Sequence, residues 1–171
     1  QPLKVIHQLP LDVLEPLVKK NTPFRDLLLE LSNVQKLAQT QWNSEMKPIH
    51  VAVATGDVQA LISLIKLGVD INHTFDNGET PAFIAAYKGD VSILQTLGAS
   101  GADLNKANNN GSTPAYVAAQ YGHHEVLCVL HQLGADLNKA NNHGSTPAFI
   151  AANNGHASVL QTLGVLGADL N

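Results

Sequence analysis

The sequence has little of what nucleic-acid-binding, secreted and membrane proteins require. Only 14% of its 171 residues are charged and the formal net charge is −4, which argues against the basic surface that nucleic acids need. Cys128 is the only cysteine, so no internal disulfide can form and a reducing compartment is expected. No apolar run approaches the roughly 20 residues that span a bilayer. We therefore expect a cytoplasmic protein with no nucleic-acid partner and no membrane span.

Catalytic and metal-binding patterns are also scarce. The sequence contains no glycine-rich phosphate loop, no H-E-x-x-H pattern and no nucleophile elbow. His124, Cys128 and His131 are spaced to share one side of a helix, and both residue types bind zinc. A plainer account follows from the repeats described next, in which Cys128 takes the position of Gln95 and Gln161. We predict a protein that is not an enzyme and that holds no cofactor and no metal.

The chain does contain a sequence motif that recurs every 33 residues. Thr80, Thr113 and Thr146 each precede Pro-Ala and an aromatic residue, and a degraded copy begins at Lys47. Two further anchors keep the same register: a glycine at 56, 89, 122 and 155, and a Gly-x-Asp triplet beginning at 68, 101, 134 and 167. These anchors indicate a four-copy array over 45–171, with copies at 45–77, 78–110, 111–143 and 144–171.

Each anchor has a physical role. The threonine can cap the N-terminus of a helix, and the following proline sits where its missing N–H is not needed. The glycine about two turns later can take the left-handed conformation that ends a helix, and a second apolar stretch with helical spacing follows. One helix pair cannot bury its own apolar faces, so neighbouring pairs must stack. We predict an all-α solenoid of stacked helix pairs that start near 47, 80, 113 and 146.

The period, the T-P-x-[H/aromatic]-x-A-A signature and the Gly-Ala-Asp-x-Asn phrase resemble ankyrin repeats. Two departures stand out. Phe83, Tyr116 and Phe149 replace the usual histidine next to an alanine that replaces the usual leucine, and we expect the larger ring to fill the core volume that alanine leaves. Gly98 and Gly164 replace apolar residues of the second helix, so we expect those helices to end early or distort.

The resemblance implies a protein–protein interaction module that binds through its concave face and loop tips. Function is expected where the copies differ, because the scaffold does not dictate those positions. Tyr87 and Tyr121 are the preferred anchors, since large aromatic side chains dominate binding hot spots, and stacking should bring them close to Phe75. The predicted binding residues are Phe75, Asp76, Tyr87, Lys88, Asn109, Gln120, Tyr121, Asn142, His143, Asn153 and Asn154. The alternative interpretation is that they are solvated loop and helix ends.

Residues 1–44 lack the repeat but are rich in apolar residues. The order Leu9-Pro10, Asp26-Leu27 and Trp42 loosely resembles an F-box, which would bind the Skp1 adaptor of a ubiquitin ligase. The other interpretation is a helical cap over the open apolar end of the array. In the second case we expect helices over 9–42 that pack on the first repeat.

The partner's identity is not contained in the sequence. Nearly identical copies rich in asparagine resemble effectors that intracellular bacteria secrete into the host cytosol, which implies a host protein as partner. Two alternatives stay open: the substrate-recognition subunit of a ubiquitin ligase, and the targeting part of an enzyme whose catalytic domain lies beyond Asn171. The chain begins at Gln1 without a methionine and ends within a repeat, so we expect a longer parent protein.

Overall fold

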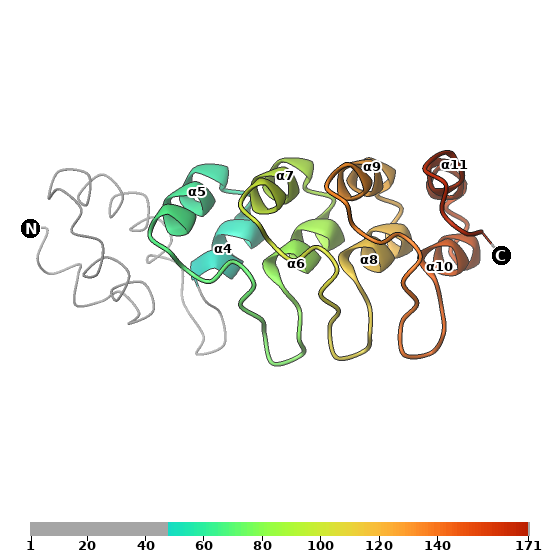
Figure 1. Cartoon of the computed structure of the whole chain (residues 1–171), viewed down its shortest axis with the longest axis horizontal. Helices are drawn as coiled ribbons and strands as arrows, with labels where there is room; N and C mark the ends of the chain where they lie inside the picture. Colours follow the sequence, from blue (N-terminus) through green and yellow to red (C-terminus); the bar gives the residue numbers. More distant parts are fainter. Residues whose placement is uncertain (1–47, 171) are drawn as a thin grey trace, which may run out of the picture. The chain divides into compact units, whose positions relative to one another are not determined.

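The computed structural model describes residues 48–170, and every regular element in that range is a helix (Figure 1). The eight helices, without a strand among the described residues, confirm the all-α prediction. None of these eight is long and apolar enough to span a membrane. The predictions for 1–44, namely the F-box-like pattern and the helical cap over 9–42, lie outside the described residues.

The chain divides into two compact units, residues 1–71 and 72–171, which are described separately. The described part of unit 1 is one helix pair, α4 (Pro48–Thr55) and α5 (Val58–Lys66). Asp57 caps α5, because its carboxylate accepts the Ala60 N–H at 3.0 Å. The degraded copy of the repeat therefore still forms the predicted helix pair.

Unit 2 contains three helix pairs in the predicted register. They are α6 (Pro81–Lys88) with α7 (Val91–Ala99), α8 (Pro114–Gln120) with α9 (His124–Gln132), and α10 (Pro147–Asn153) with α11 (Ala157–Val165). First helices pack on first helices and second helices on second helices, and the loops before α8 and α10 project on the same side (Figure 1). Within this unit the stacked-pair prediction is confirmed.

The predicted caps set the bounds of the first helices. The Thr80 hydroxyl accepts the Phe83 N–H at 3.1 Å, and the equivalent bond, at the same length, starts α8 and α10. Gly89 then ends α6 in the left-handed conformation, at φ 74°. The Thr-Pro and glycine anchors therefore act as the sequence indicated.

Side chains of the second helices form the centre of unit 2. The largest of these fully buried residues are Ile93, Leu94, Leu97, Leu127, Leu130 and Leu163. Each such side chain contributes about 1.5–3 kcal/mol by leaving water. On the first helices Phe83 and Tyr116 are buried as expected, at 6% and 7% exposure. The same expectation was wrong for Phe149, which is 62% exposed, because no described helix follows α10 and α11 to cover it.

The expectation that Gly98 and Gly164 shorten or distort their helices was also wrong. Helices α7 and α11 continue past these glycines and have nine residues, as α9 does. The next repeat explains why glycine stands at position 98, because a Cβ there would lie 2.5 Å from Leu133 Cδ1. The leucine of the next repeat therefore fills the space that an apolar side chain at position 98 would otherwise occupy.

A ladder of asparagines connects successive repeats of unit 2. The Asp103 N–H donates to Asn72 Oδ1 at 2.8 Å, and the Asp136 N–H donates to Asn105 Oδ1 at the same distance. A third rung, also 2.8 Å long, joins Asp169 to the Asn138 side chain in the same way. The asparagine of the Gly-Ala-Asp-x-Asn phrase is thus an inter-repeat acceptor, a role that the sequence pattern did not reveal.

Candidate functional site

The predicted binding residues fall into two rows of unit 2. One row lies on the projecting loops and contains Phe75, Asp76, Asn109, Asn142 and His143. The other lies at the C-terminal ends of the first helices and contains Tyr87, Lys88, Gln120, Tyr121, Asn153 and Asn154. We call the exposed side chains of α6, α8 and α10, together with the loops before them, the first-helix face.

Asparagine side chains of the loop row are used to hold the loops together. The Asn109 side-chain amide donates to the Asp76 carbonyl at 2.9 Å, and the Asn142 amide donates to the Asn109 carbonyl at 3.0 Å. Backbone bonds run in parallel, from Asn109 N–H to the Asn77 carbonyl at 2.9 Å. Asn109 and Asn142 therefore have a structural role, and their binding role stays a prediction. The same bonds keep the loop tips in fixed positions.

The two tyrosines of the helix-end row lie side by side, as the 33-residue stacking predicted. Their ring centroids are 4.7 Å apart and the ring planes meet at 79°, an edge-to-face arrangement. Each tyrosine is 48% exposed, so both rings contribute to the surface rather than to the core. Two large aromatic side chains from neighbouring repeats thus form one apolar patch.

A histidine of the following repeat holds the backbone of Tyr87. His123 Nε2 lies 2.9 Å from the Tyr87 carbonyl, and His156 repeats this bond to Gln120 at 3.0 Å. At the same position of the previous repeat, Asp90 instead caps its own helix by accepting the Ile93 N–H. The histidines thus form a bond between repeats where Asp90 forms a helix cap within its own repeat. The bond from His123 holds the backbone of Tyr87, which is one of the two tyrosines of the aromatic patch.

The remaining residues of the helix-end row lie in the same register but make other contacts. The Asn154 side-chain amide donates to the Gln120 carbonyl at 2.9 Å, and the Asn153 amide approaches the Asn154 side-chain oxygen at 3.4 Å. Lys88 is exposed at the last position of α6. Asn154 occupies the repeat position of Tyr121, so the fold tolerates a small polar side chain where the tyrosine stands.

A cavity of about 120 Å³ lies beside Tyr87. Glu79, Phe83, Ile84 and Tyr87 line it. Of these four residues only Tyr87 is a predicted binding residue, Phe83 is the expected core residue, and the sequence patterns did not indicate Glu79 or Ile84. The signal for Glu79 was available, because the other two repeats of unit 2 carry serine at its position.

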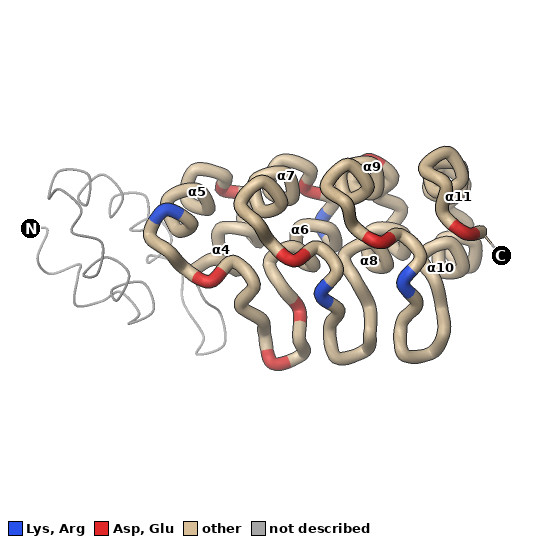
Figure 2. Tube along the Cα trace, in the orientation of Figure 1, with Lys and Arg blue, Asp and Glu red and all other residues tan. Residues whose placement is uncertain are grey.

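Charge distinguishes the loop before α6 from the next two loops. Residues 72–80 of this loop contain Asp76 and Glu79, whereas the equivalent residues 105–113 and 138–146 of the next two loops contain Lys106 and Lys139 and no carboxylate (Figure 2). Those lysines donate to backbone carbonyls of the preceding repeat at 3.2 Å, so they belong to the scaffold. The cavity therefore opens beside a segment, residues 72–80, that has two carboxylates and no lysine or arginine.

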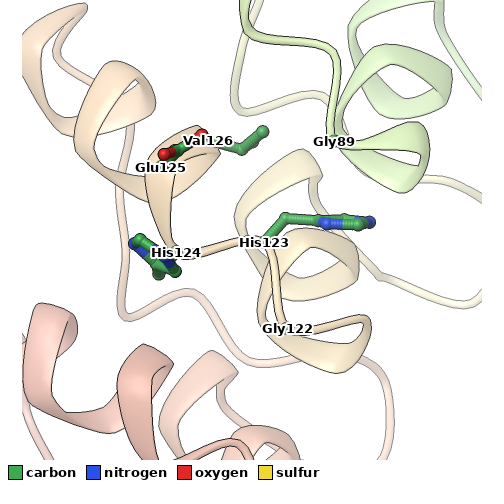
Figure 3. Close-up of a pocket in the computed structure, with 6 residues that line it drawn as sticks. All are labelled: Gly89, Gly122, His123, His124, Glu125 and Val126. Atoms are coloured by element: carbon green, nitrogen blue, oxygen red, sulfur yellow. The ribbon is translucent and has the colours of Figure 1, made fainter.

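A second cavity, of about 240 Å³, lies between the ends of the first helices and α9 (Figure 3). Its lining includes His123, His124 and Glu125, but the His123 ring extends toward Gly89 while His124 extends the other way (Figure 3). No group of three or more candidate metal ligands occurs among the described residues. His124, Cys128 and His131, considered as a zinc site from their spacing, are not brought together as one.

Two protein-family models match the chain. The model described as ankyrin repeats (3 copies) matches residues 84–171, just over half of the sequence. The model described as ankyrin repeats (many copies) matches residues 49–98. No curated protein is similar enough to match the chain. The matched ranges together cover all eight described helices except the first residue of α4.

Proposed function

The chain belongs to the ankyrin-repeat family, and from this premise we propose that its first-helix face binds a protein partner through Tyr87 and Tyr121. Ankyrin repeats are protein–protein interaction modules, and the family is generally a non-enzymatic scaffold. The resemblance to bacterial effectors adds a host protein as the proposed partner.

The exposed tyrosine pair carries the proposal. Interfaces are enriched in tyrosine, and a few aromatic anchors usually supply most of the binding free energy. Tyr87 and Tyr121 each expose about half of their surface, at 48%, although both are large and partly apolar. The fold does not need them, because asparagines 153 and 154 occupy their two positions in the last repeat. A function outside the fold explains why this pair is present.

Quantitative affinity purification from host-cell lysate tests the proposal. The bait is the full chain, compared with the variant Tyr87→Gln/Tyr121→Asn, which introduces residues that other repeats carry at these positions. We expect one or more proteins to be retained by the parent chain and lost by the variant. Glu125→Ser is the matched control, because serine is present at this position in the repeats on both sides. Equal retention by all three baits would contradict the proposal.

A further inference from the structure

We propose that the cavity lined by Glu79, Phe83, Ile84 and Tyr87 binds an arginine side chain of the protein partner. The inference rests on the proposed function, which it deepens by naming the chemical group that this face recognises. It is supported by the charge of the cavity, by its size and aromatic walls, and by the way its walls are held.

The charge of the cavity favours a cation. Glu79 is the only charged residue in the lining, and its carboxylate has no hydrogen bond or ion pair among the residues that the structure describes. Asp76 adds a second carboxylate within residues 72–80, and no lysine or arginine occurs between Lys66 and Lys88. A partly buried carboxylate without a counter-charge is stabilised by a cationic ligand.

Size and walls favour one side chain with a planar charged group. A volume of about 120 Å³ is below the roughly 300 Å³ at which pockets for drug-sized ligands begin. Phe83 and Tyr87 supply aromatic walls, and Ile84 supplies an aliphatic one. A planar guanidinium group stacks on aromatic rings and pairs with a carboxylate through two parallel hydrogen bonds, whereas a lysine ammonium is a point charge that approaches aromatic faces less often and cannot form the two parallel bonds. Arginine is therefore the side chain that matches both parts of the lining.

The walls are held in place before any ligand arrives. Tyr87 is fixed at its carbonyl by His123 and at its ring by Tyr121. The loop of Glu79 is closed by the Phe75 N–H, which donates to the Glu79 carbonyl at 3.1 Å, and by the Glu79 N–H, which donates to Asn77 Oδ1 at 3.1 Å. Pre-ordered walls reduce the entropy lost on binding, so a small cavity can still contribute to affinity.

The other repeats of unit 2 lack this combination of residues. At the four positions that line the cavity, the next repeat has Ser112, Tyr116, Val117 and Gln120. The last repeat has serine, phenylalanine, isoleucine and asparagine there. The carboxylate and the exposed tyrosine thus occur together once in unit 2, which predicts a single arginine site rather than a row of them.

Titration of the full ¹⁵N-labelled chain with N-acetyl-arginine methylamide, followed by NMR, tests the inference. We expect chemical-shift changes at the backbone amides of residues 79–87 other than Pro81, with a dissociation constant of about 1 mM for so small a ligand. The citrulline analogue has the same shape without the charge, and it should bind at least about tenfold more weakly because charge-assisted hydrogen bonds are lost. The lysine analogue should also bind more weakly.

Two substitutions to residues of the neighbouring repeats connect binding to the cavity. Glu79→Ser and Tyr87→Gln should each weaken binding of the arginine analogue by about tenfold or more. Glu125→Ser makes the same chemical change at an exposed position of α9 and should leave binding unchanged. Equal binding of citrulline, equal or tighter binding of lysine, shifts that leave residues 79–87 unaffected, or no shifts would each overturn the inference.

The two proposals fail in different ways. If captured proteins are lost by Tyr87→Gln/Tyr121→Asn but retained by Glu79→Ser, and the arginine analogue does not bind, then the arginine inference alone is wrong. If captured proteins are retained by the double tyrosine variant, the proposed function is wrong whatever the analogue does.

Discussion

Tyr87 meets Tyr121 edge to face, with ring centroids 4.7 Å apart, although the two residues occupy different positions of their repeats. Tyr87 has the repeat position of Gln120, whereas Tyr121 has that of Lys88. The contact therefore joins two different repeat positions at the ends of the neighbouring helices α6 and α8. Among the described repeats, only these two neighbours have an aromatic residue at the first position in one repeat and at the second position in the next. The patch is a local feature that the otherwise uniform array does not repeat.

The first prediction concerns the stability and binding of the tyrosine pair. An edge-to-face pair adds about 0.5–1.5 kcal/mol beyond surface burial, so Tyr87→Gln/Tyr121→Asn should lower the free energy of unfolding by about 1 kcal/mol. Helical content should be unchanged, because neither ring is core. Partner affinity should fall by at least about 30-fold, as expected for two lost hot-spot anchors. Urea unfolding with circular dichroism and a binding titration measure the two effects.

The single variants Tyr87→Gln and Tyr121→Asn separate the contribution of the ring contact from that of each tyrosine alone. In a double-mutant cycle the two substitutions should couple favourably, since each ring loses its partner when the other is removed. Additive effects on the free energy of unfolding would show that the ring contact contributes nothing to stability. A variant that loses its helical signal would contradict the assignment of both tyrosines to the surface.

The second prediction concerns the asparagine ladder. Asn105→Ala removes the acceptor of the Asp136 N–H, a bond of 2.8 Å, and should lower the free energy of unfolding by about 1 kcal/mol. Asn110→Ala is the control, because that side chain is exposed and has no hydrogen bond among the described residues. It should stay within about 0.5 kcal/mol of the parent chain. Equal effects in urea unfolding would assign the ladder no energetic role.

The fold was predictable because the residues that start and end the helices recur in each repeat. Thr80 and Gly89 act through local backbone hydrogen bonds and backbone conformation, and such short-range rules can be read from the chain. The proximity of Tyr87 and Tyr121 was predictable for a related reason. When repeats of fixed length stack, residues about one repeat apart in the sequence lie side by side in the structure.

Contacts across the repeat boundary were not predictable in the same way. Whether Asn105 bonds its own loop or the next repeat depends on the distance between repeats, which the sequence does not state. The expectation for Gly98 was wrong for this reason, since Leu133 of the following repeat occupies the space beside the glycine. Glu79 differs from the serine at the same position of the next two repeats, but the sequence does not show that it lines a cavity, because the cavity forms only when the loop packs beside α6.

The third prediction compares two adjacent histidines. His123 bonds the Tyr87 carbonyl at 2.9 Å, whereas His124 is exposed and its side chain has no partner among the described residues. His123→Ala should lower the free energy of unfolding by about 1 kcal/mol, and His124→Ala should stay within about 0.5 kcal/mol. His123→Ala should also weaken binding of the arginine analogue, because the cavity wall at Tyr87 is no longer held. Thermal and urea unfolding measure the first effect, and the NMR titration measures the second.

The last prediction uses one glycine position in two contexts. Gly78 and Gly144 both have positive φ, at 82° and 75°, so alanine at either should lose about 1–2 kcal/mol to the left-handed conformation. A Cβ at Gly78 would also lie 2.6 Å from Asn109 Oδ1 and 2.9 Å from Asn109 N, whereas a Cβ at Gly144 would meet nothing within 4 Å.

Gly78→Ala should therefore lower the free energy of unfolding by at least about 1 kcal/mol more than Gly144→Ala, which is the usual scale of overpacking. The clash falls on the loop contact in which Asn109 N–H donates to the Asn77 carbonyl, one residue before Gly78 and two before Glu79. Displacing that contact should also weaken binding of the arginine analogue, while Gly144→Ala leaves it unchanged. Equal unfolding free energies for the two variants would mean that the loops before α6 and α8 do not hold each other.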